Sequence, residues 1–180
     1  MRTLMALGAL GMMATGAGLV MAGTDKVALP EGYRSQFVRY VAVDKPDRKP
    51  PIVRFMYVNP EALAAAKSGK PAPHGTVIVM EDHRAKLDGE GHPLKDSRGR
   101  FVATDEITAI FVQEKGEGWG AEYSETKRNG EWEYAWFNAD GTRRTGPNVN
   151  LDNCFACHKE NVEHQDYTFT FAPFVQTIKK

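Results

Sequence analysis

The sequence predicts a mainly β domain with two or three short helices. Short runs of β-branched and aromatic residues recur along the chain, and turn residues such as glycine, proline and asparagine separate them. No stretch shows the long apolar repeat of period 3.6 that a helical bundle requires. We expect strands at residues 37–43, 52–58, 76–80, 106–113 and 131–137.

The first two strands are separated by a clear loop. Residues 37–43 (FVRYVAV) and 52–58 (IVRFMYV) have strong β character, whereas residues 45–51 hold three prolines and four charges. Asn59 and Pro60 then suit the N-cap and the first position of a helix. We expect this helix to continue to about Lys67.

The later elements follow the same logic. Residues 76–80 (TVIVM) form a strand, and residues 86–101, rich in glycine and charge, form a hairpin extension or a mobile loop. The strand at 131–137 follows the turn pair Asn129-Gly130. From about Asn150 we expect a helical turn, and residues 168–171 are a closing segment of uncertain type.

The first 22 residues have the features of a signal peptide. Arg2 provides a positive start, an apolar run extends from Leu4 to Met21, and small residues precede a cleavage point after Ala22. A retained membrane anchor is the alternative, although the run is short and rich in glycine, which weakens a helix. We therefore expect an exported, periplasmic protein whose residues 23–180 form one domain.

The charges of the chain balance. Lysine and arginine number 23, as do aspartate and glutamate, so the formal net charge is zero. This composition favours neither nucleic acid nor an anionic membrane surface as a partner.

The most informative motif is Cys-Phe-Ala-Cys-His at residues 154–158. Two thiols at this spacing reach both vinyl groups of a heme, and the histidine directly after the second cysteine then lies under the iron. The motif predicts one covalent heme c on Cys154 and Cys157, with His158 as axial ligand.

Two other uses of a Cys-x-x-Cys pair must be weighed. A redox disulfide usually begins a helix in a βαβ unit, and this chain shows no such unit. A zinc site needs further ligands, for which the sequence offers little beyond His164.

The chain resembles the cytochrome P-460 family and its relative, the cytochrome c-prime-beta group. The matching pieces are Leu-Pro-Glu-Gly-Tyr-Arg (29–34), Val-Arg-Phe-Met-Tyr-Val-Asn-Pro-Glu (53–61), Gly-Thr-Val-Ile-Val (75–79), Asn-Gly-Glu-Trp-Glu-Tyr (129–134) and Cys-Phe-Ala-Cys-His-Lys (154–159). The resemblance implies an antiparallel β-sandwich or open barrel with added helices, usually as a homodimer.

The chain departs from that family at one informative position. Members that oxidise hydroxylamine carry a lysine bonded to the heme rim, and the resemblance places that lysine at Met80. A thioether cannot form the same nitrogen–carbon link, and Lys86, six residues on, is a poor substitute. Hydroxylamine oxidation is therefore doubtful.

Several side chains are candidates for the open side of the iron. The resemblance implies a distal arginine at Arg54, for which a surface position on an edge strand is the alternative. Met80 can fill the core, line the pocket as an apolar cap, or ligate iron opposite His158. Met56 and His83 are lesser candidates for the sixth position.

One carboxylate remains a candidate proton acceptor. Glu133 alternates with Trp132, Tyr134 and Trp136, an aromatic stripe typical of a core, and is otherwise a solvated residue. We assign no role to the histidines in polar turns, which are His74, His92 and His164.

These observations favour a periplasmic monoheme cytochrome that carries electrons or binds a small gas such as nitric oxide. Its partners would be redox proteins or small nitrogen-oxide ligands. An enzyme that oxidises hydroxylamine or nitric oxide is the alternative, and a heme-based gas sensor is a third possibility.

Overall fold

The computed structural model describes residues 23–179, so the expected signal peptide lies outside the described residues. The elements in chain order are η1 (Gly23–Lys26), α1 (Tyr33–Gln36), β1 (Val38–Lys45), β2 (Ile52–Val58), α2 (Pro60–Ala65), β3 (Val77–Ala85), β4 (Ala103–Lys115), β5 (Trp132–Phe137), α3 (Asp152–Val162), η2 (Glu163–Gln165) and α4 (Phe171–Ile178).

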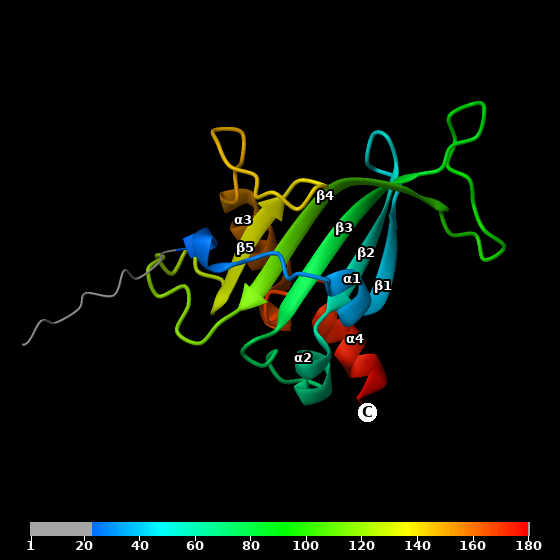
Figure 1. Ribbon diagram of the computed structural model, residues 1–180. Coiled ribbons are helices and arrows are strands. Elements are labelled where there is room, and N and C mark those ends of the chain that lie inside the picture. The colour runs from blue at the N-terminus through cyan, green and yellow to red at the C-terminus, as the bar shows by residue number, and fades with distance from the viewer. Residues whose placement is uncertain (1–22, 180) are drawn as a thin grey trace, which may run out of the picture.

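The strands form one five-stranded antiparallel sheet in the order β1-β2-β3-β4-β5 (Figure 1). Each strand pairs with its neighbour in the chain. This arrangement confirms the mainly β, antiparallel class, in the form of a single open sheet in the part of the chain that the structure describes.

The observed ends of the strands and helices can be compared with the predicted ones. The bounds of β2 agree with the expected 52–58, while β3 continues five residues beyond the expected end at residue 80. The extension is polar, and it remains in the strand because the buried Glu81 and Asp82 find hydrogen-bond partners there. The helix expected to reach Lys67 ends at Ala65.

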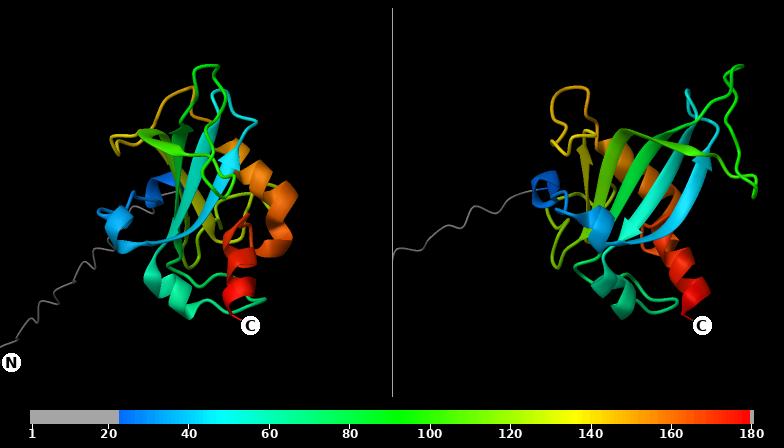
Figure 2. Two further views of the ribbon diagram at one scale, coloured as in Figure 1. Left: turned by 90° about the vertical axis from the view of Figure 1, so that its right-hand side faces the viewer. Right: turned by 45° about the vertical axis from the view of Figure 1, so that its right-hand side comes forward.

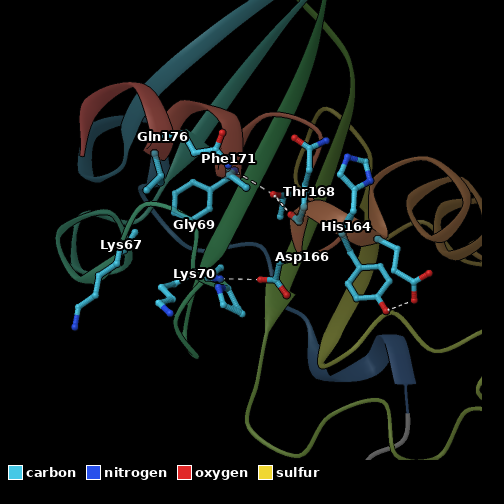
Figure 3. Close-up of a pocket in the computed structure, with 16 residues that line it drawn as sticks. Lys67, Gly69, Lys70, His164, Asp166, Thr168, Phe171 and Gln176 are labelled. Carbon is cyan, nitrogen blue, oxygen red and sulfur yellow. Dashed lines mark hydrogen bonds between the residues drawn. The ribbon is translucent and has the colours of Figure 1, made fainter. Parts of the chain in front are cut away.

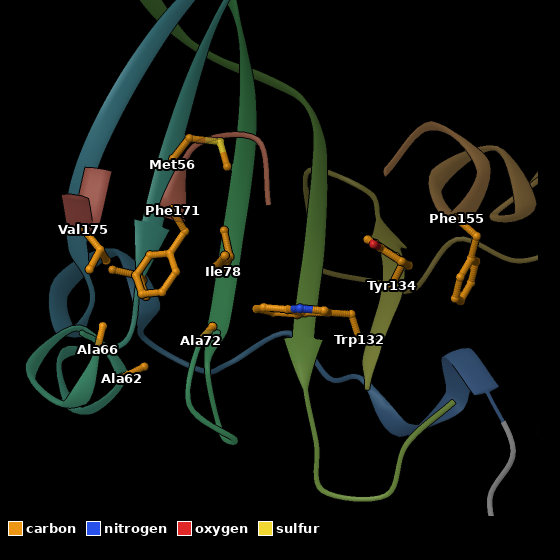
Figure 4. Packing of buried hydrophobic residues seen from close by; sticks show 11 residues of the cluster. Met56, Ala62, Ala66, Ala72, Ile78, Trp132, Tyr134, Phe155, Phe171 and Val175 are labelled. Carbon is orange, nitrogen blue, oxygen red and sulfur yellow. The ribbon is translucent and has the colours of Figure 1, made fainter. Parts of the chain in front are cut away.

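The two faces of the sheet are covered differently (Figure 2). We call the face that packs against α3 and α4 the helical face; Met56, Ile78 and Tyr134 belong to its core, together with Phe155 of α3 and Phe171 of α4 (Figure 4). The opposite, N-terminal face packs Tyr57, Val79, Ile110 and Phe137 against Val27 and Tyr33.

The segment at residues 86–101 projects from the sheet as an extended arm (Figure 1). Isolated bridges join Leu87 to Pro93 and Lys95 to Phe101, so the expected hairpin extension is confirmed. No helix among the described residues has the length and hydropathy needed to cross a membrane.

Candidate heme site

The motif residues lie on α3, a helix of 11 residues rather than a single turn. Cys154, Cys157 and His158 are spaced i, i+3 and i+4, which places them on one side of the helix. Phe155 faces the core instead, and its ring meets Tyr134 at 4.8 Å and Tyr123 at 5.0 Å between centroids. The buried Phe155 therefore fixes the helix to β5 and leaves the motif side chains together.

His158 is held in a defined orientation. Its Nδ1 donates a hydrogen bond to the backbone carbonyl of Tyr167 at 2.7 Å, and its ring contacts Tyr134 and Phe169. Burial lowers the pKa of His158, which favours the neutral imidazole. Among the described residues none hydrogen-bonds to Nε2, so this nitrogen keeps the lone pair that a metal ligand needs.

The two cysteines are free thiols in different surroundings. Burial, reinforced by the neighbouring Cys157, raises the pKa of Cys154 to about 11. Reactive cysteines of redox disulfides have lowered pKa values instead. The raised pKa therefore gives no support to a thiolate nucleophile at Cys154.

Tyr134, whose ring contacts His158, belongs to the helical face of the sheet. Apolar side chains of the neighbouring strands lie on the same face. Met56 and Met80 lie opposite each other in register, and Met80 lies opposite Phe111. Phe111 and Trp136 stack with centroids 5.1 Å apart. The buried indole Nε1 of Trp136 has no hydrogen-bond partner within residues 23–179.

These features fit a heme. A porphyrin is a large flat apolar body with polar propionates at its rim, and thioether and aromatic side chains suit its faces. An unpaired buried N–H such as that of Trp136 is costly unless a group absent from the chain accepts it. The described residues thus offer two attachment thiols, an oriented imidazole and an apolar lining.

Arg54 lies on the helical face of β2, a strand inside the sheet rather than at its edge, and it is not a free cation. Its Nε and Nη2 donate to the two carboxylate oxygens of Asp82 at 2.7 and 2.8 Å. Both side chains are largely buried. Asp82 was missed at the sequence level, because its position opposite Arg54 depends on the register of β2 against β3.

The structure does not bring two other candidates to this face. His83 and Glu133 alternate with residues of the helical face and so lie on the N-terminal face. His83 bonds to Glu81 and to the carbonyl of Thr104. Glu133 accepts a hydrogen bond from Tyr123 at 3.0 Å. Of the described carboxylates, Asp82 is the one that the sheet places beside Met80.

Lys86 and the histidines to which we assigned no role lie elsewhere in the structure. Lys86 is exposed at the start of the arm, and His92 lies on the arm as well. His74 bonds to Glu131 at 2.5 Å. His164 is exposed and lines a cleft of about 370 Å³ beside α4, together with Asp166 and Tyr167 (Figure 3). No cluster of three or more His, Cys, Asp or Glu side chains within residues 23–179 is placed to hold a metal ion.

Comparison with known families agrees with the site. The family model described as Cytochrome P460 matches residues 30–170, which is most of the chain and includes the Cys-x-x-Cys-His motif. No curated protein matches the sequence. The chain therefore belongs to the cytochrome P460 family of heme proteins.

Proposed function

We propose that this protein is a periplasmic monoheme c-type cytochrome that carries electrons or binds a small ligand such as nitric oxide. The observation that carries the proposal is the geometry of α3. His158 is anchored through Nδ1 with no hydrogen bond to Nε2 among the described residues, on the same side of the helix as two thiols that form no disulfide.

Each residue would have a separate task. Cys154 and Cys157 would attach the heme through two thioether bonds, and His158 would donate Nε2 to the iron. The heme, when bound, supplies a redox-active iron with a position for a sixth ligand. Met56, Met80, Phe111 and Trp136 would exclude water from the other side.

The paired arginine bears on the choice between these functions. A free Arg54 could bind an anionic substrate or ligand, but its charge is already balanced by Asp82 within the helical face. With Met80 at the position of the cross-linking lysine, the helical face favours electron transfer or uptake of a neutral gas over chemistry on a charged substrate.

Visible and EPR spectra of the purified heme-loaded protein test this function. We expect an ordinary c-type ferrous spectrum, and either a His/Met six-coordinate ferric heme or a ferrous heme that binds nitric oxide. We expect no turnover of hydroxylamine with an artificial electron acceptor. A ferrous Soret band at the red-shifted position of a lysine-bonded heme, together with hydroxylamine turnover, would overturn the proposal.

Export and assembly belong to the same proposal. We propose cleavage after Ala22 and a homodimer as the working form, on the strength of the signal-like N-terminus and the family resemblance. N-terminal sequencing of protein recovered from the periplasm tests the first. Light scattering at several concentrations tests the second, and a monomer throughout would contradict it.

A further inference from the structure

The loop between η2 and α4 has an uncommon backbone. Asp166 and Tyr167 follow one another with φ values of 52° and 56°, in the left-handed region that residues other than glycine rarely adopt. The carbonyl of Tyr167 is the acceptor of the hydrogen bond from His158 Nδ1. The conformation of these two residues therefore decides where the acceptor of the histidine lies, and contacts elsewhere must sustain it.

Two side chains of β4 supply those contacts. Gln113 Nε2 donates to the Tyr167 carbonyl at 2.8 Å, and Lys115 Nζ donates to both carboxylate oxygens of Asp166 at 3.0 and 2.9 Å. Gln113 and Lys115 are two residues apart, so the strand presents both to the same face. We call Gln113, Lys115 and Asp166 the β4 clamp.

The carboxylate of Asp166 is held from a third direction. The backbone N–H of Ala72 donates to Asp166 Oδ2 at 2.7 Å, which ties the loop to the segment before β3 (Figure 3). The lysine and aspartate side chains of the clamp are only 7% and 17% exposed. Removing two charges from water is costly and often adds no net stability, so such a pair is better explained by the position that it fixes.

We propose that Asp166 and Lys115 are positioning residues for His158, which hold the Tyr167 carbonyl on its Nδ1–H and so set the orientation and basicity of the ligand. This inference rests on the proposed function, because it requires His158 to ligate the heme iron. A hydrogen bond to the outer nitrogen of a ligating histidine strengthens the donation of the inner one. Neither Asp166 nor Lys115 contacts the ligand directly, and both act through the loop.

The test uses the heme-loaded full chain and two variants, each of which replaces one partner of the Lys115–Asp166 ion pair. Asp166→Asn removes the charge but keeps a residue that tolerates left-handed backbone and an oxygen that can accept from Ala72. Lys115→Met removes the cation and preserves most of the volume. The matched control is Asp44→Asn, since Asp44 also bonds a cation, Arg100, and a backbone N–H, that of Phe101.

Two properties are measured in each variant. The first is the exchange rate of the His158 Nδ1–H proton, which the ferric heme shifts to a resolved position in the NMR spectrum. The second is the midpoint reduction potential. Both clamp variants should speed exchange by about tenfold, the equivalent of losing one hydrogen bond. Both should also raise the potential, because a weaker ligand favours ferrous iron.

The controls separate the possible failures. Asp44→Asn should leave both properties at wild-type values, and a thermal melt of each variant shows that the comparison is made on folded protein. If both clamp variants behave like Asp44→Asn, the positioning role is refuted while the heme assignment stands. If the wild-type protein has no heme-shifted histidine proton and no covalent heme, the proposed function itself fails.

Discussion

Two glutamates buried on the N-terminal face hold opposite protonation preferences. Burial alone would raise the pKa of Glu81, but hydrogen bonds from His83, Tyr33 and Arg34 lower it to about 2. Burial raises the pKa of Glu133 to about 7. The hydrogen bond that Tyr123 donates to one carboxylate oxygen only partly offsets burial, and the other oxygen has no partner within residues 23–179. The difference arises from the number of donors, since both carboxylates are almost fully buried.

Glu81 should stabilise the fold above acidic pH. Its pKa is lower in the folded than in the unfolded protein, so its contribution is present above about pH 4.5 and is lost as the pH falls towards 2. Glu81→Gln should lower the free energy of unfolding at pH 7 by about 3 kcal/mol. It should also flatten the loss of stability between pH 5 and 2.

Denaturant titrations at a series of pH values measure this effect. Glu106→Gln is the control, because Glu106 is exposed and bonds Arg84 at the surface. If the free energy of unfolding of Glu81→Gln falls between pH 5 and 2 as steeply as that of the wild type, the lowered pKa of Glu81 is contradicted.

Glu133 should act in the opposite sense. Its pKa is higher in the folded than in the unfolded protein, so the folded state gains from the protonated form and loses stability as the pH rises from about 4.5 through 7. Glu133→Gln mimics the protonated carboxyl and should raise the free energy of unfolding at pH 8 by about 3 kcal/mol. The same denaturant titrations measure this effect. Equal free energies of unfolding for wild type and variant at pH 8 would contradict the raised pKa of Glu133.

At the scale of elements, the connection from β4 to β5 holds two nearby glycines, Gly118 and Gly120, that differ in their surroundings. Gly118 and Gly120 both have positive φ values, 72° and 78°. A Cβ at Gly120 would lie 2.6 Å from the backbone oxygen of Gly130, whereas a Cβ at Gly118 would meet nothing within 4 Å. The two positions therefore share backbone strain and differ in packing.

This pair separates the two effects. Gly118→Ala should cost about 1 kcal/mol for the left-handed backbone alone, and Gly120→Ala should cost about 1–3 kcal/mol more because backbone must move. Thermal unfolding of the two variants checks the difference. Equal losses in the two variants would mean that the connection can shift freely.

The elements also show how far the sequence predicts the structure. The apolar run of β2 and the motif of α3 are local patterns, and both were predicted. The extension of β3 was missed because Glu81 and Asp82 interrupt the apolar pattern, and their partners come from distant segments. The helix α4 was missed because residues 168–171, which lead into it, alternate like a strand.

The candidate site likewise contains residues that the sequence predicts and residues that it does not. Cys154, Cys157 and His158 follow from their spacing alone. The acceptor of His158 is a backbone carbonyl in a loop, and its supports on β4 lie more than 50 residues away in the chain. Side-chain patterns carry no signal for a carbonyl, and left-handed aspartate and tyrosine have no sequence signature comparable to glycine.

At the scale of the whole molecule, the sheet separates two chemical environments. The helical face carries the motif helix, the methionines and the Arg54–Asp82 pair, and the N-terminal face carries the Glu81 network. The proposed function and the positioning role of Asp166 and Lys115 both depend on the helical face holding a heme through α3.

Intact mass spectrometry of the mature protein tests that dependence most directly. After acid denaturation and extraction with organic solvent, the polypeptide should retain the mass of one heme and its red colour. The Cys154→Ala/Cys157→Ala double variant should lose both. A wild-type chain that releases its colour into the solvent, or that has the mass of the bare polypeptide, would contradict the account.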